Sequence, residues 1–340
     1  MSTIKMDPRR EMDLVNRIVE AALGQSQPSI KKLVGHTFPD TDVWACLWAA
    51  KKFIEKAQEA EIVFVRAGES LETDDDESVL HFDTGGGEYD NHNDENDKRS
   101  SFALFVDKMG WLTKWPGLTS LVELTNTVDN IGVLPATSIH YIIEGLPRKK
   151  EYKTERGPDW EKIQERVFEL FDIVFNQEEQ RIRSRAEFRR SAEIRLLPNG
   201  LRVASLFWKL NLREAAFETG IDVMVGTEAR GAGKFYVVIQ RNRKLNGKLG
   251  LDVVAATLRS REASIRRIPI NGKNLRIKNT IEGIPGWFLH KSFGLILCGS
   301  KAFPLTKEEF TKQDPRGIAD ATCRALSSIP KAMVDGWRKK

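Results

Sequence analysis

The stretch Val34–Cys46, which reads VGHTFPDTDVWAC, decides the fold of this chain. The residues leading up to Val34 are typical of a strand end, and the segment 42–58 has apolar residues at helical spacing. The stretch is therefore predicted to be the turn between a strand and a helix. In α/β folds such turns lie at the carboxyl edge of the sheet, where ligands bind.

Three side chains of this turn have the spacing of metal ligands. His36 is followed by Asp40 four residues later and by Asp42 two residues after that. Clustered carboxylates repel each other, and hard oxygen ligands together with an imidazole suit Mn²⁺ or Mg²⁺. A second interpretation stays open at this point, because either aspartate could instead cap the N-terminus of the helix.

Three later segments carry further polar residues of the same kind. Residues 81–93 read HFDTGGGEYDNHN and place Asp83 after a short predicted strand, with His92 beyond a run of glycines. Residues 128–130 read VDN and place Asp129 at the end of an apolar helical run. Residues 283–294 read GIPGWFLHKSFG.

In order and spacing, these segments resemble the motifs of the DHH phosphoesterase superfamily. That superfamily carries H-x-x-P-D-x-D, then a lone aspartate, then D-H-H, then a fourth aspartate, and His36–Asp42 matches the first motif at each fixed position. The glycine run before Tyr89-Asp90 and the pair Asp129-Asn130 are most similar to the melanocyte-proliferating-gene branch. The segment 283–294 is similar to the closing motif of that branch. The resemblance consists of short separate motifs within residues 30–305.

The resemblance implies two ions, Mn²⁺ or Mg²⁺, that share one carboxylate. It gives His36 and Asp40 to the first ion and Asp42 and Asp129 to the second, with Asp83 as the bridge between them.

The third motif departs from the D-H-H pattern. Asn91 stands where the superfamily has the first histidine, so a neutral amide oxygen would take the place of an imidazole at the second ion. His92 falls on the second histidine, which the resemblance places beside the scissile phosphate. Asp83 and His92 are thus the expected catalytic residues.

The implied activity is metal-dependent phosphodiester hydrolysis by a two-metal mechanism, as a 3′–5′ exonuclease on RNA or single-stranded DNA. Two alternatives stay open: a phosphatase or phosphodiesterase for small nucleotides, and a catalytically impaired nucleic-acid-binding or regulatory protein, which Asn91 favours. Besides His92, the expected contacts to the substrate phosphate are His290, Lys291, Gly299, Ser300 and Lys301.

The charge distribution is uneven along the chain. The net charge is +5, but residues 148–280 hold 29 Lys and Arg against 17 Asp and Glu, an excess of 12. A basic segment beside an acidic metal site suits a phosphate-bearing polymer. A solvated surface of mixed charge would give the same composition.

Composition and length set further expectations. A chain of 340 residues predicts about two domains. Apolar runs all fall short of the roughly 20 residues of a membrane span, and residues 1–12 carry no targeting signal. The three scattered cysteines indicate a reducing compartment. We therefore expect a cytoplasmic protein that does not bind membranes; the oligomeric state stays open, a homodimer included.

The predicted fold class is α/β, with three parts. Residues 1–147 form a DHH-like, parallel-sheet, metal-binding domain, residues 148–192 a charged linker and a long bridging helix, and residues 193–340 a smaller α+β substrate-binding domain. Within these parts we expect a helix at 9–23, a surface turn at 74–77, a long helix at 159–192 and a hairpin at 221–239. The segments 100–109, 118–128 and 136–143 are expected to be helices, as is most of 306–338.

Overall fold

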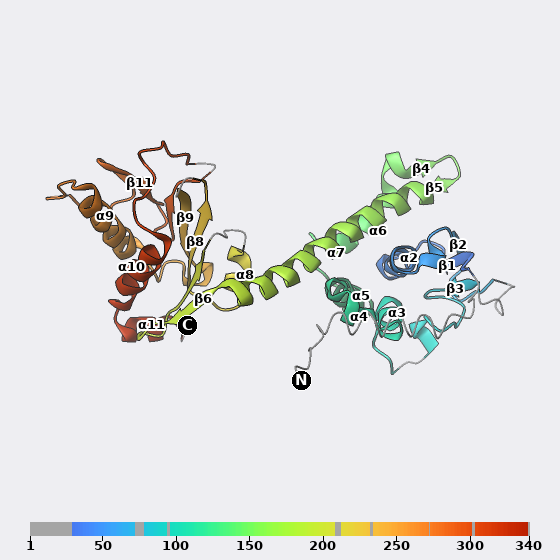
Figure 1. The fold of residues 1–340 in the computed structure, drawn as a ribbon. Coiled ribbons are helices and arrows are strands. Elements are labelled where there is room, and N and C mark those ends of the chain that lie inside the picture. Colours follow the sequence, from blue (N-terminus) through green and yellow to red (C-terminus); the bar gives the residue numbers. More distant parts are fainter. Residues whose placement is uncertain are drawn as a thin grey trace, which may run out of the picture. The chain divides into compact units, whose positions relative to one another are not determined.

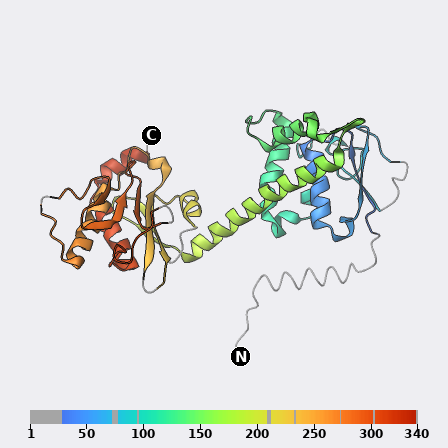
Figure 2. The same cartoon turned by 90° about the horizontal axis from the view of Figure 1, so that it is seen from above.

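The structure is a computed structural model that describes residues 29–71, 78–93, 96–207, 212–231, 234–271, 273–300 and 303–338. The predicted helix at 9–23, the turn at 74–77 and Lys301 lie outside these residues. The chain divides into two compact units, residues 1–179 and 180–340, with the boundary inside one continuous helix (Figures 1 and 2).

Unit 1 is built on a small parallel sheet, as the sequence predicted. Its three strands, in the order β2-β1-β3, are β2 (Glu61–Val65), β1 (Lys32–His36) and β3 (Val79–His81), and both neighbours of β1 run parallel to it. The central strand is apolar because both of its faces are covered: Leu33 and Val34 are fully buried. Gly35 lets the next helix approach, since a Cβ there would lie 2.5 Å from Val43.

Helix α2 (Thr41–Phe53) passes through the core of unit 1. Its first ten residues, Thr41 to Ala50, are all buried, which explains why it is apolar on nearly every side. One side packs on the aromatic residues of α7 (Trp160–Ser191): the ring centroids of Trp48 and Phe171 lie 5.7 Å apart. The Trp48 indole N–H also donates to Asp172. The first half of α7 thus closes the core around α2.

The remaining elements of unit 1 are α3 (Ser101–Lys108), α4 (Trp111–Lys114), α5 (Thr119–Ile131), α6 (Ile139–Gly145), β4 (Lys153–Thr154) and β5 (Gly157–Pro158). The helix expected at 136–143 begins only at Ile139, because the Ser138 side chain caps it. The segment expected as a charged linker holds a short 3₁₀ turn and the antiparallel hairpin β4–β5, whose turn Gly157 permits with φ +128°.

Unit 2 is a mixed sheet covered by helices. Its strands, in the order β10-β11-β12-β9-β8-β7-β6, are antiparallel except for the pair β7 and β8. They are β6 (Glu193–Leu196), β7 (Arg202–Leu206), β8 (Val223–Ala229), β9 (Phe235–Arg241), β10 (Asn279–Ile281), β11 (Ile284–Leu289) and β12 (Leu295–Cys298). Its helices are α8 (Arg213–Glu218), α9 (Asp252–Arg266), α10 (Pro315–Ser327) and α11 (Lys331–Arg338). The predicted hairpin is confirmed as β8–β9.

Two further features of the described chain bear on its chemistry. Its helices are all too short or too polar to cross a membrane. Cys46, Cys298 and Cys323 are buried free thiols, so the cysteines are packing residues here.

A buried carboxylate joins α9 to the chain that follows β12. Glu262 is 1% exposed, and it accepts hydrogen bonds from Thr311, the backbone of Lys312, Gln313 and the Trp287 indole, besides an ion pair with Arg266. Burial alone would raise the pKa of Glu262, but the hydrogen bonds from Thr311 and Arg266 outweigh it and lower the pKa.

We expect unit 2 to lose stability in acid through Glu262. Because the folded pKa is depressed, the stabilisation is complete above the unfolded pKa of about 4.3 and is lost as pH falls through the folded value. Thermal unfolding of the full chain should show a lower Tm for Glu262→Gln than for the wild type at pH 7, and the difference should shrink at pH 3.5. An equal difference at both pH values would contradict this account.

Candidate metal centre

The candidate ligands lie where two parallel strands end. His36 is the last residue of β1, and Asp83 follows its neighbour β3 by two positions. Because parallel strands share one carboxyl edge, these residues come from distant sequence positions to the same place. Asp40 and Asp42 follow in the turn into α2 and in its first turn.

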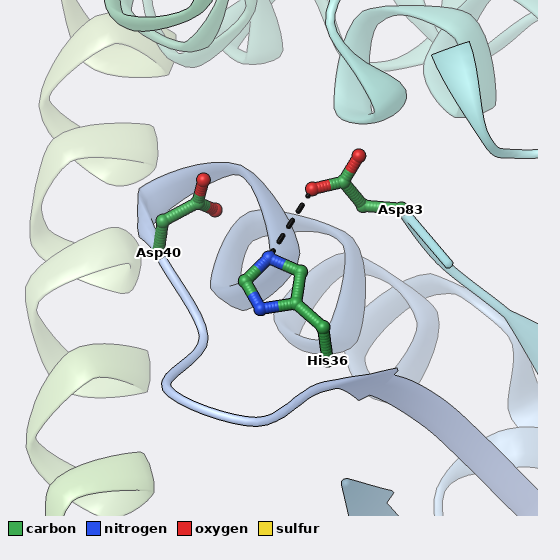
Figure 3. A group of neighbouring side chains, drawn as sticks. All are labelled: His36, Asp40 and Asp83. Atoms are coloured by element: carbon green, nitrogen blue, oxygen red, sulfur yellow. Dashed lines mark ion pairs between the residues drawn. The ribbon is translucent and has the colours of Figure 1, made fainter. Parts of the chain in front are cut away.

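One group of ligands consists of His36, Asp40 and Asp83, whose donor atoms all lie within 4.8 Å of one another (Figure 3). The Nε2 atom of His36 is 3.3 Å from Oδ2 of Asp83. The hydrogen bond with Asp83 outweighs burial and raises the pKa of His36 to about 9. The imidazole of His36 thus lies beside two carboxylates, those of Asp40 and Asp83.

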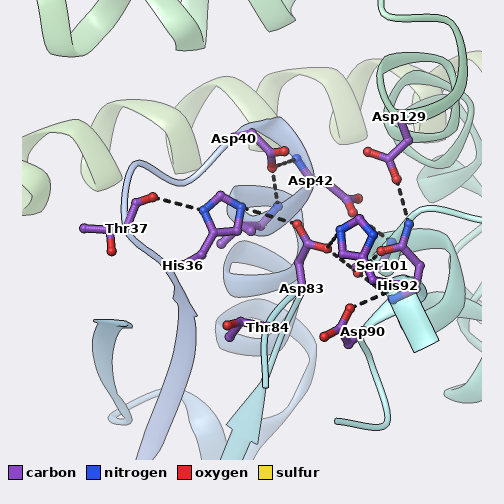
Figure 4. Close-up of polar contacts among 12 residues, drawn as sticks. His36, Thr37, Asp40, Asp42, Asp83, Thr84, Asp90, His92, Ser101 and Asp129 are labelled. Carbon is purple, nitrogen blue, oxygen red and sulfur yellow. Dashed lines mark hydrogen bonds and ion pairs between the residues drawn. The ribbon is translucent and has the colours of Figure 1, made fainter. Parts of the chain in front are cut away.

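A second group consists of Asp83, Asp90 and His92, again within 4.8 Å. Nε2 of His92 lies 3.3 Å from Oδ1 of Asp83, so the two oxygens of one carboxylate face two imidazoles (Figure 4). The backbone of Asp83 has φ +54°, a conformation that aspartate tolerates better than most residues. Asp83 is thus the member common to both groups.

Asp40 caps helix α2. Its Oδ1 atom accepts hydrogen bonds from the backbone N–H groups of Asp42 and Val43, at 2.9 and 3.0 Å. Both of these bonds fall on one oxygen, so the cap and a metal ligand are compatible roles for the same side chain. Burial raises the pKa of Asp40, and the charge of Asp83 raises it further.

Asp42 is fully buried and binds a different helix. Its two oxygens accept hydrogen bonds from the backbone N–H groups of Ser101 and Phe102, the first residues of α3, at 2.8 and 3.0 Å. Burial raises its pKa well above the usual value, and the charges of Asp129, Asp40 and Asp83 add to the effect. In this structure Asp42 holds the N-terminus of α3 beside the site. Its role as a ligand of the second ion stays a prediction.

Asn91 forms hydrogen bonds with two residues of the site, Asp129 and Ser101. Its amide nitrogen donates to Oδ2 of Asp129 at 2.9 Å, and its amide oxygen accepts from the Ser101 hydroxyl at 3.0 Å. Burial, followed by the charges of Asp40 and Asp83, raises the pKa of Asp129 to about 6. Asn91 therefore orients Asp129, and the role of its amide oxygen as a ligand of the second ion stays a prediction.

The donor set fits a divalent cation. Carboxylate oxygens and imidazole nitrogens are ligands for Mn²⁺, Mg²⁺ or Zn²⁺. Burial is the main cause of the raised pKa values of Asp42 and Asp129, and the charges of the neighbouring carboxylates Asp40 and Asp83 raise them further. A bound cation would relieve that repulsion, which is an electrostatic reason for the cluster to hold a metal.

Sequence reasoning missed three contributors to this site. Asp90 accepts from the backbone N–H groups of Gly86 and His92 and so fixes the loop that carries His92. The Ser101 hydroxyl lies 3.1 Å from Oδ1 of Asp83. Nδ1 of His140 lies 2.8 Å from the hydroxyl of Thr41, beside Asp40. Asp90 could have been found from its place in the D-N-H triplet; the other two depend on contacts between distant helices.

The predicted phosphate contacts in unit 2 take part in local turns. Nδ1 of His290 lies 2.9 Å from the Ser292 hydroxyl, and the Ser300 hydroxyl accepts from the backbone of Phe303. Gly299 has φ +80°, and a Cβ there would lie 2.4 Å from the Tyr236 ring, so the fold itself requires this glycine. A role for these residues and for Lys291 in binding phosphate stays a prediction.

Comparisons with known proteins show similarity to a protein family and to solved structures. A family model described as the C-terminal domain of ChrB matches residues 34–177, which include every candidate ligand of unit 1. No curated protein matches the chain. Among solved structures, a DHH-domain protein described as a member of a family of ribosomal proteins is 12% identical, with a TM-score of 0.29 over 95% of this chain and 100% of that chain. The resemblance to the DHH superfamily therefore continues to rest on the sequence motifs.

Proposed function

We propose that this protein is a metal-dependent phosphoesterase. The observation that carries the proposal is that one carboxylate, Asp83, belongs to two groups of metal-ligating side chains at the carboxyl edge of a parallel sheet. A carboxylate shared in this way could bridge two ions of a two-metal hydrolytic site. The motif order of the DHH superfamily, with its fixed aspartates, supports the same conclusion.

The residues have distinct tasks in this proposal. His36, Asp40 and Asp83 would hold one ion. Asp83 would also hold the second ion, together with Asp42, Asn91 and Asp129 as the resemblance implies. Bound cations of this kind supply an activated water and neutralise charge on a phosphate. His92 is 76% exposed, so its side chain is available to donate a hydrogen bond to a phosphate oxygen. Asn91 and Ser101 keep Asp129 and Asp83 in place.

The substrate class that we propose is a nucleic acid, RNA or single-stranded DNA, cleaved from its 3′ end. The support is the motif resemblance together with the excess of 12 positive charges over residues 148–280. In unit 2, Arg181 and Arg185 are paired with Glu218, so part of this basic character is neutralised locally. The charge argument thus supports the substrate class less strongly than the motifs do.

Cleavage of labelled oligonucleotides tests the proposal. RNA and DNA oligomers labelled at either the 5′ or the 3′ end are incubated with the full chain and Mn²⁺, and a second set receives EDTA. We expect Mn²⁺-dependent release of mononucleotides, with the 3′ label released first. A wild-type protein that releases no nucleotide from either polymer with Mn²⁺ would contradict the exonuclease. Cleavage of dinucleotides alone would favour the small-nucleotide alternative.

The contacts of Asn91 favour a second candidate, a binding or regulatory protein with a weakened second site. Replacing Asn91 by histidine tests it, because an imidazole is a better ligand for Mn²⁺ than a neutral amide. We expect calorimetric titration to show the weaker Mn²⁺ step tightened by about tenfold, or about 1.4 kcal/mol, in Asn91→His. The matched control is Asn130→His, because Asn130 donates to the carbonyl groups of Lys98 and Asn126 and is not a predicted ligand. An unchanged titration would show that position 91 does not face an ion.

A further inference from the structure

A pocket of about 520 Å³ lies in unit 1 beside the candidate metal centre. Its size is within the range of pockets that hold small organic ligands. The residues that line it include Phe38, Pro39, Glu144, Arg148, Lys153 and Trp160. Phe38 and Pro39 belong to the turn between His36 and Asp40, so the pocket adjoins the first group of candidate ligands.

Phe38 is held in an unfavourable backbone conformation with its ring in solvent. Its φ is +57°, in the left-handed region that bulky residues rarely enter, and the residue is 68% exposed. The ring meets Trp160 edge to face, with centroids 5.6 Å apart. Burial of the Phe38 side chain does not compensate for this backbone strain, because the residue is exposed. Residues with strained backbones cluster at ligand sites. The pair therefore offers a flat group an aromatic surface at the edge of the metal centre.

The other side of the pocket is charged. Arg148 and Lys153 are both exposed, and the Lys153 ammonium has no ion-pair partner within the described part of the chain. Glu144 of α6 lines the same pocket, is half-buried and provides a hydrogen-bond acceptor. An aromatic wall, two cations and one acceptor are complementary to a ring that carries N–H groups and a phosphate.

We propose that this pocket binds the nucleotide next to the scissile phosphate, with its base on Phe38 and Trp160 and its outer phosphate at Arg148 and Lys153. The inference rests on the proposed function for the position of the scissile phosphate, and it adds the groups that select the substrate. A purely aliphatic phosphoester or inorganic phosphate would leave the aromatic wall unused. The substrate is therefore one with a base on the pocket side of the bond.

Binding without catalysis tests the pocket separately from the reaction. The probe is the 5′-phosphorylated dinucleotide pApA, titrated calorimetrically into the full chain in EDTA. We expect Phe38→Asn to weaken pApA binding by about tenfold, since stacking of a base on an aromatic ring carries much of the affinity. Asparagine tolerates the left-handed conformation, so this variant should fold as well as the wild type. The control is Tyr141→Asn, an aromatic residue of α6 that is 40% exposed and outside the pocket.

The charged side is tested by Arg148→Gln with Lys153→Gln. This double variant should bind pApA about tenfold more weakly, with a smaller salt dependence, because two phosphate contacts are removed. The matched control is Lys149→Gln with Lys150→Gln, in the same exposed segment. Equal affinity of the pocket variants and the wild type, equal losses in the controls, or inorganic phosphate binding as tightly as pApA would overturn the inference.

The outcomes also separate the inference from the proposed function. If the pocket variants lose pApA binding while the wild type cleaves no oligomer with Mn²⁺, the nucleotide-binding pocket is supported and the proposed phosphoesterase activity is contradicted. If oligomers are cleaved equally well by Phe38→Asn and by the wild type, the phosphoesterase stands and the pocket does not.

Discussion

Asp83→Asn is expected to lower the rate of Mn²⁺-dependent phosphodiester hydrolysis by on the order of 10³-fold, the scale seen when one preorganised electrostatic group is removed from an active site. Asp83 is the carboxylate that both ligand groups share, so its charge cannot be replaced by a single neighbour. Asparagine has nearly the same shape and accepts the left-handed conformation of this position, φ +54°. The expected loss is therefore one of charge at the metals, with the fold retained.

The measurement combines rate, metal content and folding. Asp83→Asn should bind less than the wild-type amount of Mn²⁺, while its circular dichroism spectrum stays the same. Asp97→Asn is the matched control, because Asp97 pairs with Arg99 outside both ligand groups. Full activity and two bound ions in Asp83→Asn would remove the basis of the proposed function.

Asp42→Ala is expected to destabilise unit 1 by about 2 kcal/mol, even in EDTA. The substitution leaves the buried N–H groups of Ser101 and Phe102 without their acceptors, and each buried unsatisfied donor costs about 1–3 kcal/mol. Relief of repulsion among Asp42, Asp129 and Asp40 offsets part of that cost. For a unit of this size the loss corresponds to a decrease in Tm of roughly 5 °C.

The matched comparison is Asp129→Asn, which removes a neighbouring charge of the same cluster. Asparagine keeps an oxygen that can accept from the Asn91 amide, and this hydrogen bond is exposed to solvent, so the substitution should change the Tm of the metal-free protein little. Thermal unfolding in EDTA compares the two variants directly. If Asp42→Ala unfolds at the wild-type temperature without metal, Asp42 is not the structural anchor described here.

The sequence predicted the parts of the site that depend on local pattern. The turn from β1 into α2 follows from an apolar strand, the proline at position 39 and a helical apolar period, and the structure confirms both elements. The helix predicted over 42–58 ends earlier, at Phe53, and a separate 3₁₀ turn follows at Glu55–Ala57. The position of Asp129 in the last turn of α5 followed from the same periodicity. The parallel pairing of β1 with β3 could be expected because helices separate the strands.

Contacts between distant segments could not be predicted in this way. Capping of α3 by Asp42 joins residues about 60 positions apart, and periodicity carries no information on such pairs. The same holds for the Ser101 hydroxyl beside Asp83 and for the exposed ring of Phe38, whose backbone conformation a single sequence does not reveal. In unit 2 the β8–β9 hairpin was local and was predicted, whereas the placement of β12 beside β9 spans about 55 residues and was not.

Because Cys46, Cys298 and Cys323 are buried, we expect them to react slowly with thiol reagents in the native chain. A single cysteine introduced on the surface, for example at Lys150, would then be the main site of attachment for a nitroxide or a fluorophore. A paramagnetic ion at the metal centre would broaden or quench such a label according to its distance, so occupancy of the site becomes a spectroscopic signal that needs no substrate.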